Sequence, residues 1–409
     1  MNPNTLLPNI ATLRRRDLLK IGAAASAGAM VAVPAWAQGA PIKLGALLPL
    51  TGAGGPYGGP MAKAAKGVID EVNAAGGVNG RKIELVIEDD QTSPEAAVRA
   101  ARKLIDVDKV AAVMGTWASA VTTAVAPLCW ESKTFQTTTS GADSITLLPH
   151  QGYLIRTQPN TTLQGQKFGA YAVELGAKKV FFITPQTPFV KTQLEGITAA
   201  LKKVGGTVGS LVYDDKRPSY RSEVEELLRF GPDAVILGGY TPDTTVLLKD
   251  MFRAGFKGQK LGFGYSINQK LIEGVPADVV EGSYTISPSP AEGSQAYAKA
   301  AKLSGMANPD PYTAQMYDQV NLVILALAAG GGDMNGTTIK NSVRSISQGA
   351  GHQKVDNAVE GLKLLAAKKT IDYDGASGPC DFTDIGDIVD CKFRYEQVKA
   401  GKIAMLRIA

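Results

Sequence analysis

The chain has 409 residues, with 43 lysines and arginines against 38 aspartates and glutamates, and a formal net charge of +5. Its first 37 residues hold four of the basic and one of the acidic residues, so the remainder carries 39 against 37 and lacks the concentrated basic face that nucleic-acid binding needs. That remainder, about 370 residues, is longer than one hydrophobic core usually supports, which predicts two lobes.

The N-terminal segment has the pattern of an export signal. Residues 14–20 read RRRDLLK, the uncharged run 21–33 follows, and residues 35–37 read AWA. A basic start, a short apolar run and an Ala-x-Ala site are typical of a signal peptide, and the paired arginines favour the twin-arginine type. A membrane anchor is the alternative, but thirteen residues are too short to cross about 30 Å of hydrocarbon. We therefore predict a signal peptide over residues 1–37, cleavage after Ala37 and a periplasmic location.

The mature part begins with a series of alternating strand-like and helix-like segments. Short apolar or alternating runs predict the strands, and apolar residues at helical spacing predict the helices. The predicted order is strand 42–48, helix 59–75, strand 82–88, helix 94–107, strand 110–114 and helix 119–131. A polar connector with a proline, residues 157–161, separates this series from the next.

A second series of the same kind follows the connector. Its predicted order is strand 179–184, helix 194–204, strand 207–213, helix 220–230, strand 234–237 and helix 244–254. A strand over 283–287, a helix-rich stretch over 294–365 and a hairpin-like tail over 371–408 complete the chain. This alternation predicts an α/β protein with parallel-rich sheets covered by helices.

The loop after the first strand is rich in glycine and presents one aromatic side chain. In doubly wound sheets ligands bind outside the carboxyl ends of the strands, so Tyr57 in the loop 49–58 is placed to close over a small molecule. The alternative is a dinucleotide fingerprint, which Gly52 and Gly54 would start. Tyr57 stands where the third glycine is needed, and a phosphate site is therefore disfavoured.

Hydroxyl side chains follow the predicted strand over residues 110–114 and the strand that comes after it. Thr116 and Ser119 flank Trp117 at the start of the helix 119–131, where a hydroxyl and free backbone N–H groups bind a carboxylate well. The alternative is that Thr116 or Ser119 simply caps this helix. Residues 139–141, Thr139-Ser140-Gly141, add further donors, and Tyr240 ends a strand of the second series. Together these residues predict a binding site for a small carboxylate.

Cysteine and histidine are sparse. Cys380 and Cys391 lie in the hairpin-like tail, and an oxidising periplasm would permit a disulfide between them, with two free thiols as the alternative. Cys129 lies on an apolar helical stretch and is expected to be a buried free thiol. The two histidines, His150 and His352, are far apart and not grouped with cysteines, so we expect no metal site and no cofactor.

Several stretches resemble one known family. The most specific is residues 71–85, which read EVNAAGGVNGRKIEL, continued by 89–91 and 101–105 and, in the second series, by 232–235 and 238–240. In these residues the chain resembles the Leu/Ile/Val-type substrate-binding proteins of branched-chain amino-acid ABC transporters, over essentially the whole mature part. The resemblance implies a type I periplasmic binding protein with two Rossmann-like lobes and a three-segment hinge. It assigns residues 42–158 and 287–370 to the first lobe, and residues 159–286 and 371–409 to the second.

The resemblance also implies roles for individual residues. Tyr57 would cover the ligand, Ser119 would bind its carboxylate, and Ser140 or Gly141 would lie beside backbone donors, while Phe189 and Tyr240 would be the aromatic residues of the second lobe. The implied partners are a small-molecule ligand and the permease subunits of an ABC transporter in the inner membrane. We expect the receptor itself to be a monomer.

The sequence departs from the family where amino-acid binders carry an acid for the ligand's ammonium group. Residues 263–267 read FGYSI, and no acid occurs before Glu273, so Tyr265 stands in this part of the expected site. Trp117 also adds bulk beside Ser119. An ammonium group buried without a charged partner costs several kcal/mol, which favours an aromatic or aliphatic carboxylate, or an amide, over leucine.

Other classes of function fit the sequence less well. A hydrolase needs a nucleophile with a base, but the chain has no Gly-x-Ser-x-Gly elbow and only two histidines, so we expect no enzyme activity. A receptor that senses a ligand without transport shares the fold and remains an alternative. A transcription factor is disfavoured because an export signal, and not a DNA-binding motif, precedes the first strand.

Overall fold

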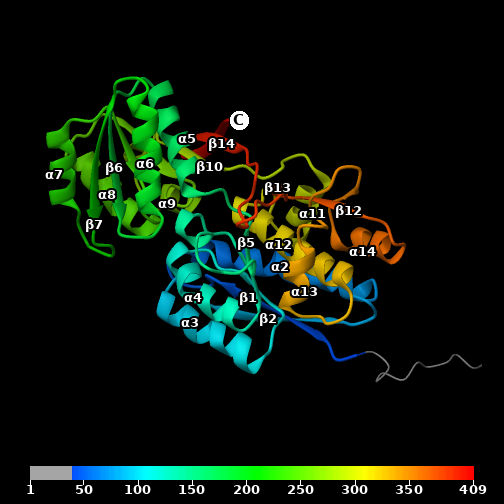
Figure 1. Cartoon of the computed structure of the whole chain (residues 1–409). Helices are drawn as coiled ribbons and strands as arrows, with labels where there is room; N and C mark the ends of the chain where they lie inside the picture. Colours follow the sequence, from blue (N-terminus) through cyan, green and yellow to red (C-terminus); the bar gives the residue numbers. More distant parts are fainter. Residues whose placement is uncertain (1–38) are drawn as a thin grey trace, which may run out of the picture. The chain divides into compact units, whose positions relative to one another are not determined.

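The computed structural model describes residues 39–409, and the predicted signal peptide with its cleavage site lies outside them. The described strands form a five-stranded, a seven-stranded and a small three-stranded sheet. None of the helices in this part of the chain reaches the length and apolarity that crossing a lipid bilayer takes. We call the elements around the five-stranded sheet the first lobe and those around the seven-stranded sheet the second lobe (Figure 1).

The sheet of the first lobe is entirely parallel. Its strands are β1 (Ile42–Leu48), β2 (Ile83–Asp89), β3 (Ala112–Gly115), β4 (Phe135–Thr138) and β5 (Leu154–Arg156), in the order β2-β1-β3-β4-β5. Its helices from the first half of the chain are α2 (Gly55–Ala74), α3 (Pro94–Arg102), which continues as a π-helix over Lys103–Val107, and α4 (Ser119–Glu131). The predicted alternation of strands and helices is confirmed here.

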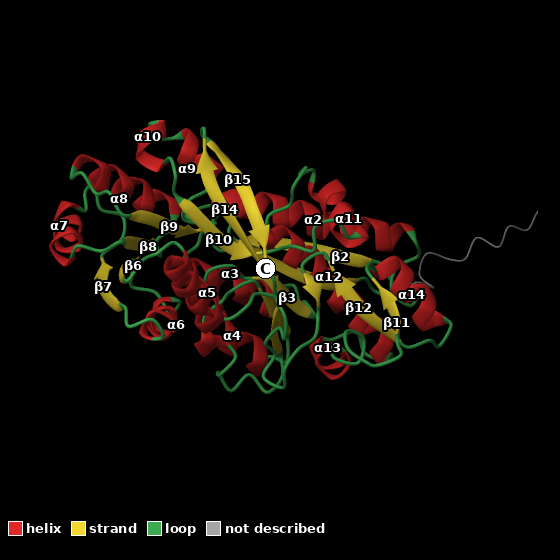
Figure 2. Ribbon diagram, turned by 90° about the horizontal axis from the view of Figure 1, so that it is seen from above, coloured by secondary structure: helices red, strands yellow, loops and turns green. Residues whose placement is uncertain are grey.

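The sheet of the second lobe is parallel except at one edge. Its order is β15-β14-β10-β9-β8-β6-β7, with β6 (Lys179–Pro185), β7 (Thr207–Tyr213), β8 (Ala234–Leu237), β9 (Gln259–Phe263), β10 (Tyr284–Pro288), β14 (Phe393–Lys399) and β15 (Lys402–Ile408). The helices of this lobe are α5 (Thr161–Glu174), α6 (Val190–Lys202), α7 (Arg221–Phe230), α8 (Thr241–Arg253), α9 (Gln269–Glu273) and α10 (Ala277–Val280). Figure 2 shows β14 and β15 continuing the sheet beyond β10.

After β10 the chain returns to the first lobe. It forms α11 (Gln295–Ser304), α12 (Pro311–Gly330), α13 (Gly336–Ser342), β11 (Gln353–Val355) and α14 (Ala358–Ala366). The helix α12 packs against α2 and is buried without interruption from Tyr312 to Leu327. Its apolar stretch over residues 320–327 therefore belongs to the core.

The last passage between the lobes comes later in the chain than expected. We predicted that the second lobe resumes at Ile371, but β12 (Ile371–Gly375) pairs with β11 and with β13 (Gly378–Pro379) in the three-stranded sheet. The chain joins the seven-stranded sheet only at Phe393, where β14 pairs with β10. The boundary at residue 370 is thus wrong, because Asp318 on α12 accepts hydrogen bonds from Ala376 N (2.7 Å) and Ser377 N (2.7 Å) and holds this turn on the first lobe.

The glycine-rich segment after β1 is also more regular than predicted. The helix α2 begins at Gly55, four residues before the expected start, and Tyr57 lies in its first turn instead of in a flexible loop. Pro56 is compatible with this start, because the first helical N–H groups have no acceptor within the helix and proline lacks the group.

Candidate functional site

A cavity lies between the two lobes, at the carboxyl ends of their strands. Its volume is about 30 Å³, enough for only one or two water molecules. None of the fourteen residues of the described chain that line it carries a charged side chain at neutral pH. The first lobe provides Trp117, Ala118, Ser119, Ala120, Thr139, Gly141, Gln158 and Tyr312, and the second lobe provides Pro185, Thr187, Phe189, Gly238, Tyr240 and Tyr265.

Seven of the ten residues predicted for the site line this cavity. They are Trp117, Ser119, Thr139, Gly141, Phe189, Tyr240 and Tyr265. They meet because each follows or closely precedes a strand end or helix start on the facing edges of the two sheets. The other three, Tyr57, Thr116 and Ser140, lie behind or beside the lining.

Ser119 presents a donor at the start of α4. The N-cap position of this helix is Ala118, and no side chain caps it, so the alternative that Thr116 or Ser119 is the cap is wrong. The Ser119 Oγ accepts a hydrogen bond from Ala142 N at 3.2 Å, which leaves its own proton to donate. The first N–H groups of α4 have no acceptor within the helix and add a partial positive charge here.

Thr116 and Ser140 form part of the support beneath this helix start. The Thr116 carbonyl accepts from Thr138 Oγ1 (2.6 Å), Ser140 Oγ (2.8 Å) and Thr122 Oγ1 (3.2 Å), all of them buried. Thr116 has a φ of +33°, a conformation that needs such support in a residue with a Cβ. Both residues therefore hold the turn after β3, and the prediction that they contact ligand directly does not agree with their position outside the lining.

Aromatic rings fill most of the space between the lobes. Trp117 is at their centre: its ring centroid lies 5.3 Å from Tyr57, 5.4 Å from Tyr240, 5.6 Å from Tyr312 and 6.0 Å from Tyr265. Burial raises the pKa of Tyr240 to about 12, so its hydroxyl stays protonated at neutral pH. A planar apolar group can stack among these rings.

Tyr57 connects the lobes from outside the small cavity. Its hydroxyl donates to Gly264 O at 3.4 Å and accepts from Asn268 Nδ2 at 3.3 Å, both in the second lobe. It lines a second pocket of about 590 Å³ that shares Tyr265 and Tyr312 with the first. Tyr57 thus covers the cavity through its stacking on Trp117 and does not reach the lining itself.

The segment after β9 contains no acid, as the sequence indicates. Tyr265 contributes its ring to the cavity, and the neighbouring Ser266 hydroxyl donates to Gly239 O at 2.5 Å. The carboxylate of Asp310 lies near the second pocket, but it caps α12 by accepting from Tyr312 N (2.9 Å) and Thr313 N (3.1 Å). Asp310 lines that second pocket, and it also accepts from Thr313 Oγ1 at 2.6 Å within the first lobe.

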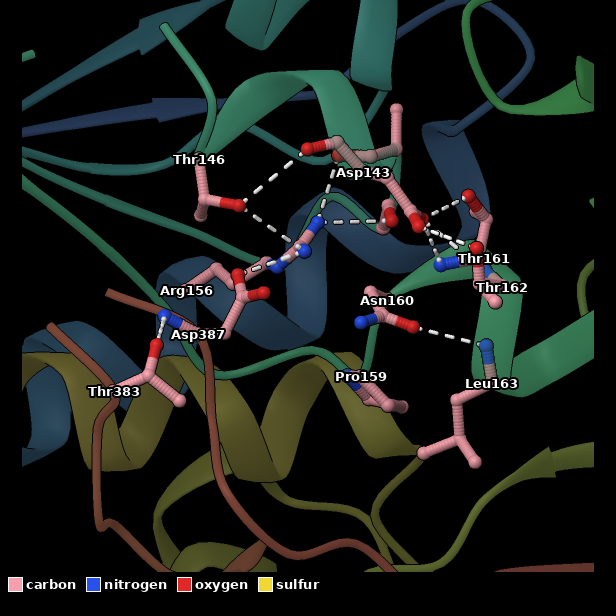
Figure 3. A network of polar contacts seen from close by, with 12 residues as sticks. Asp143, Thr146, Arg156, Pro159, Asn160, Thr161, Thr162, Leu163, Thr383 and Asp387 are labelled. Carbon is pink, nitrogen blue, oxygen red and sulfur yellow. Dashed lines mark hydrogen bonds and ion pairs between the residues drawn. The ribbon is translucent and has the colours of Figure 1, made fainter. Parts of the chain in front are cut away.

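A buried ion pair positions the loop that carries Gly141 (Figure 3). The guanidinium of Arg156, fully buried at the end of β5, donates to Gly141 O (2.9 Å) and Ala142 O (2.7 Å) and pairs with Asp387 at 2.7 Å. Asp143 extends the network by accepting from Thr161 N at 2.8 Å at the start of α5. The loop of the site is therefore fixed to the first and the last passage between the lobes.

The sequence did not single out half of the lining. Gln158 lies in the polar connector that we recognised only as a passage between lobes, and Tyr312 lies in a stretch interpreted only as helix-rich. Asp310 and Pro311 signal the start of α12 and could have placed Tyr312 at the site edge of the fold. The remaining lining residues that we missed are Ala118, Ala120, Pro185, Thr187 and Gly238.

The cysteines of the tail do not form the predicted disulfide. Cys380 and Cys391 are both free, and so is the buried Cys129, as expected for the latter. The Cys380 sulfur lies 3.7 Å from Gly378 O, whereas that of Cys391 lies 3.2 Å from Lys392 O. The two residues flank a short hairpin in which Phe382 and Ile388 form an antiparallel bridge, but no disulfide joins them.

Comparison with known proteins gives matches over half of the chain or more. A family model described as periplasmic binding protein matches residues 41–402. An amino acid binding protein of Pseudomonas aeruginosa is 29% identical over 53% of this chain and 58% of its own length, so the chain spans just over half of that relative. The Leu/Ile/Val-binding protein homolog 1 of Brucella abortus is 27% identical over 78% of this chain and 86% of its own. BasB, a chemotactic signal transduction substrate-binding protein of Halobacterium salinarum, is 24% identical over 84% of each chain.

Solved structures share the fold. A leucine binding protein, LivK, of Thermotoga maritima superposes with a TM-score of 0.75 at 22% identity, covering 90% of this chain and 98% of its own. An ABC transporter solute binding protein of R. palustris in complex with benzoate has a TM-score of 0.72 at 20% identity, covering 90% and 96%. These relatives are binding proteins and not enzymes, which agrees with the expectation from the sequence that the chain has no enzyme activity. The extent of the family match and the two-lobed fold lead to one conclusion: the chain belongs to the periplasmic binding protein family.

Proposed function

We propose that the chain is the solute receptor of an ABC importer and that it captures a small carboxylate-bearing ligand between two closing lobes. The observation that carries the proposal is an uncharged cavity between the lobes, with aromatic rings on both sides and a hydroxyl donor at the start of α4. A ligand that contacts both lobes stabilises the closed form, which the permease can then distinguish from the open one. Because the cavity is small, we expect the ligand to enter an open form and the rings to adjust around it.

The donors favour a carboxylate. Ser119 offers its hydroxyl proton, α4 offers its first N–H groups, and Thr139 Oγ1 is buried without a hydrogen-bond partner among the described residues. A carboxylate accepts several such bonds at once, and the helix N-terminus favours its negative charge. Ser119, Thr139 and Gly141 are therefore proposed to bind the carboxylate, while Trp117, Phe189, Tyr240 and Tyr265 enclose the rest of the ligand.

The absence of an acid in the lining disfavours an α-amino acid. An ammonium group held among rings and hydroxyls would lose its hydration without a charged partner, at a cost of several kcal/mol. We therefore propose an aromatic or aliphatic carboxylate, or an amide, ahead of leucine. The fold accommodates such a ligand, since the R. palustris protein was solved with benzoate.

Membership of the family implies a periplasmic or extracellular location. We propose the periplasm, reached through the twin-arginine-type signal over residues 1–37 and cleavage after Ala37. The proposed partners are the permease subunits of an inner-membrane ABC transporter, which a monomeric receptor would contact in its closed form. Purification from periplasm followed by N-terminal sequencing tests the cleavage, and Gln38 is the expected first residue.

A ligand screen on the mature chain tests the proposed function. Thermal unfolding is measured with leucine, isoleucine, benzoate, 4-hydroxybenzoate, hexanoate and benzamide, and each hit is then titrated by calorimetry. A ligand that binds only the folded state raises the midpoint, and we expect this for the acids or the amide and not for leucine. The variant Ser119→Ala should weaken binding of a carboxylate about tenfold. Tight binding of leucine without affinity for any acid or amide would contradict the proposal.

Sensing without transport is a second candidate, and the likeness to BasB favours it. The two roles differ in what happens after the lobes close. Uptake of a radiolabelled hit is compared in cells with and without this chain. Loss of uptake supports the importer, whereas unchanged uptake together with a lost chemotactic response supports the sensor.

A further inference from the structure

One polar side chain of the cavity has a donor with no partner. Gln158, in the first passage between the lobes, is only 2% exposed yet lines the cavity. Within residues 39–409, the only hydrogen bond of its side chain is the one that its Oε1 accepts from Gln315 Nε2 at 2.6 Å. The Gln158 Nε2 is thus left to face the cavity.

Gln315 donates from Nε2 to the Gln158 amide, while its own Oε1 is buried without a hydrogen-bond partner among the described residues. It is buried on α12, does not line the cavity, and has Gln158 as its hydrogen-bond partner. One turn further on, Gln319 binds other groups: it accepts from Gly115 N (3.0 Å) and Thr137 Oγ1 (2.7 Å). Gln319 Nε2 also donates to Thr157 Oγ1 (2.9 Å), so both glutamines hold the connector and Gln319 holds the strand ends as well.

An amide donor that lines a cavity and has no acceptor in the protein gains free energy when a ligand supplies the acceptor. The proposed carboxylate donors, Ser119, Thr139 and Gly141, come from α4 and the loop after β4, whereas Gln158 comes from the passage after β5. A second donor on a separate segment suits a second polar group on the ligand. Leucine has no such group beyond its carboxylate and ammonium.

We infer that Gln158 is a specificity residue that donates from Nε2 to a second acceptor on the ligand, such as a ring hydroxyl or carbonyl oxygen, and that Gln315 is its positioning residue. This inference rests on the proposed function, because it takes the first acceptor to be the carboxylate. It assigns the ligand to the acids that carry an oxygen on the ring or chain.

The test uses pairs of acids that have the same shape but differ in the acceptor. Dissociation constants of 3- and 4-hydroxybenzoate are measured against those of 3- and 4-methylbenzoate for the mature chain. We expect the wild type to favour the better hydroxy acid about tenfold over its methyl analogue. Gln158→Met should bring this ratio close to one, and Gln315→Met should lower it severalfold without touching the ligand. Gln193→Met is the control, since Gln193 is fully buried, its side chain has no hydrogen-bond partner among the described residues, and it lies outside the lining.

The outcomes separate this inference from the proposed function. If Gln158→Met folds and keeps the wild-type ratio, or weakens the hydroxy and methyl acids equally, the inference is wrong while the carboxylate site stands. If the wild type binds none of the four acids, the inference falls together with the aromatic form of the proposed function. Thermal unfolding of each variant confirms folding, and Gln315→Met alone decides the matter if Gln158→Met does not fold.

Discussion

Asp90 shows what a single buried acid contributes at the edge of the site. It follows β2, is fully buried, and has one oxygen that accepts from Thr92 N at 2.6 Å and another without a partner among the described residues. Burial, opposed by that bond and aided by the charge of Asp89, raises the pKa of its carboxyl to about 7. The folded state therefore holds the proton more tightly than the unfolded state.

The consequence is a loss of stability as the pH rises. The contribution of Asp90 is fully present below about pH 4 and disappears as the pH passes through about 7. Asp90→Asn keeps an acceptor for Thr92 N and cannot ionise. Urea unfolding of the mature chain should show the variant gaining roughly 2–3 kcal/mol on the wild type between pH 5 and pH 8. If the free energies of unfolding of the two proteins changed in parallel over this range, the prediction that burial raises the pKa of the Asp90 carboxyl would be wrong.

Among the residues of the site, the sequence predicted those that follow a recognisable strand. Trp117, Ser119 and Tyr240 follow short buried strands, and the rule that ligands bind at strand ends was enough to place them. Gln158 could not be found in this way, because its role depends on Gln315, which is distant in sequence and meets it only in the folded chain. The disulfide is a similar case, since the spacing of Cys380 and Cys391 in a hairpin permits a bond that the folded chain does not form.

A buried ion pair joins two of the segments that connect the lobes. Arg156 at the end of β5 pairs with Asp387 of the last passage, and its backbone N–H donates to Gly386 O at 2.9 Å. Removing one partner of a buried pair leaves the other charge unpaired, which costs about 3–5 kcal/mol. Arg156→Met should lower the free energy of unfolding by that amount and weaken ligand binding by displacing Gly141.

Lys66→Met is a suitable comparison, because Lys66 pairs with Asp70 on the exposed face of α2 and such pairs contribute about 0–1 kcal/mol. Urea unfolding of both variants gives the two losses. Similar small losses in the two proteins would mean that the Arg156 pair does not stabilise the passages.

The bounds of the helices and strands could be predicted from the sequence far better than the pairing of the strands with one another. The strands β1, β7 and β8 and the helix α4 have the predicted bounds. The strand β12 was assigned to the wrong lobe because nothing local distinguishes a strand that pairs with β11 from one that pairs with β10. That choice is made by Asp318 on a helix about sixty residues earlier, through tertiary hydrogen bonds that have no local sequence pattern.

For the whole molecule, the contacts of Tyr57 with the second lobe bear on the balance between open and closed forms. Asn268 donates to the Tyr57 hydroxyl and to Thr241 Oγ1 (2.8 Å), while its Oδ1 caps α9 by accepting from Leu271 N at 3.0 Å. Asn268→Ser should keep the cap but be too short to reach Tyr57, and Tyr57→Phe should keep the stacking on Trp117 but lose the hydroxyl. Asn268→Ser removes one bond between the lobes, and Tyr57→Phe removes that bond together with the one to Gly264 O.

We expect both variants to shift the ligand-free chain toward the open form by severalfold, since one net hydrogen bond contributes about 1 kcal/mol. Small-angle scattering of the mature chain should show a larger radius of gyration for each variant than for the wild type, with little change in the unfolding midpoint. The double variant should be no more open than Tyr57→Phe alone, because that change already removes the bond to Asn268. Additive opening would show that Tyr57 and Asn268 act through separate contacts, and an unchanged radius in both would show that the aromatic rings around Trp117 keep the lobes together without this link.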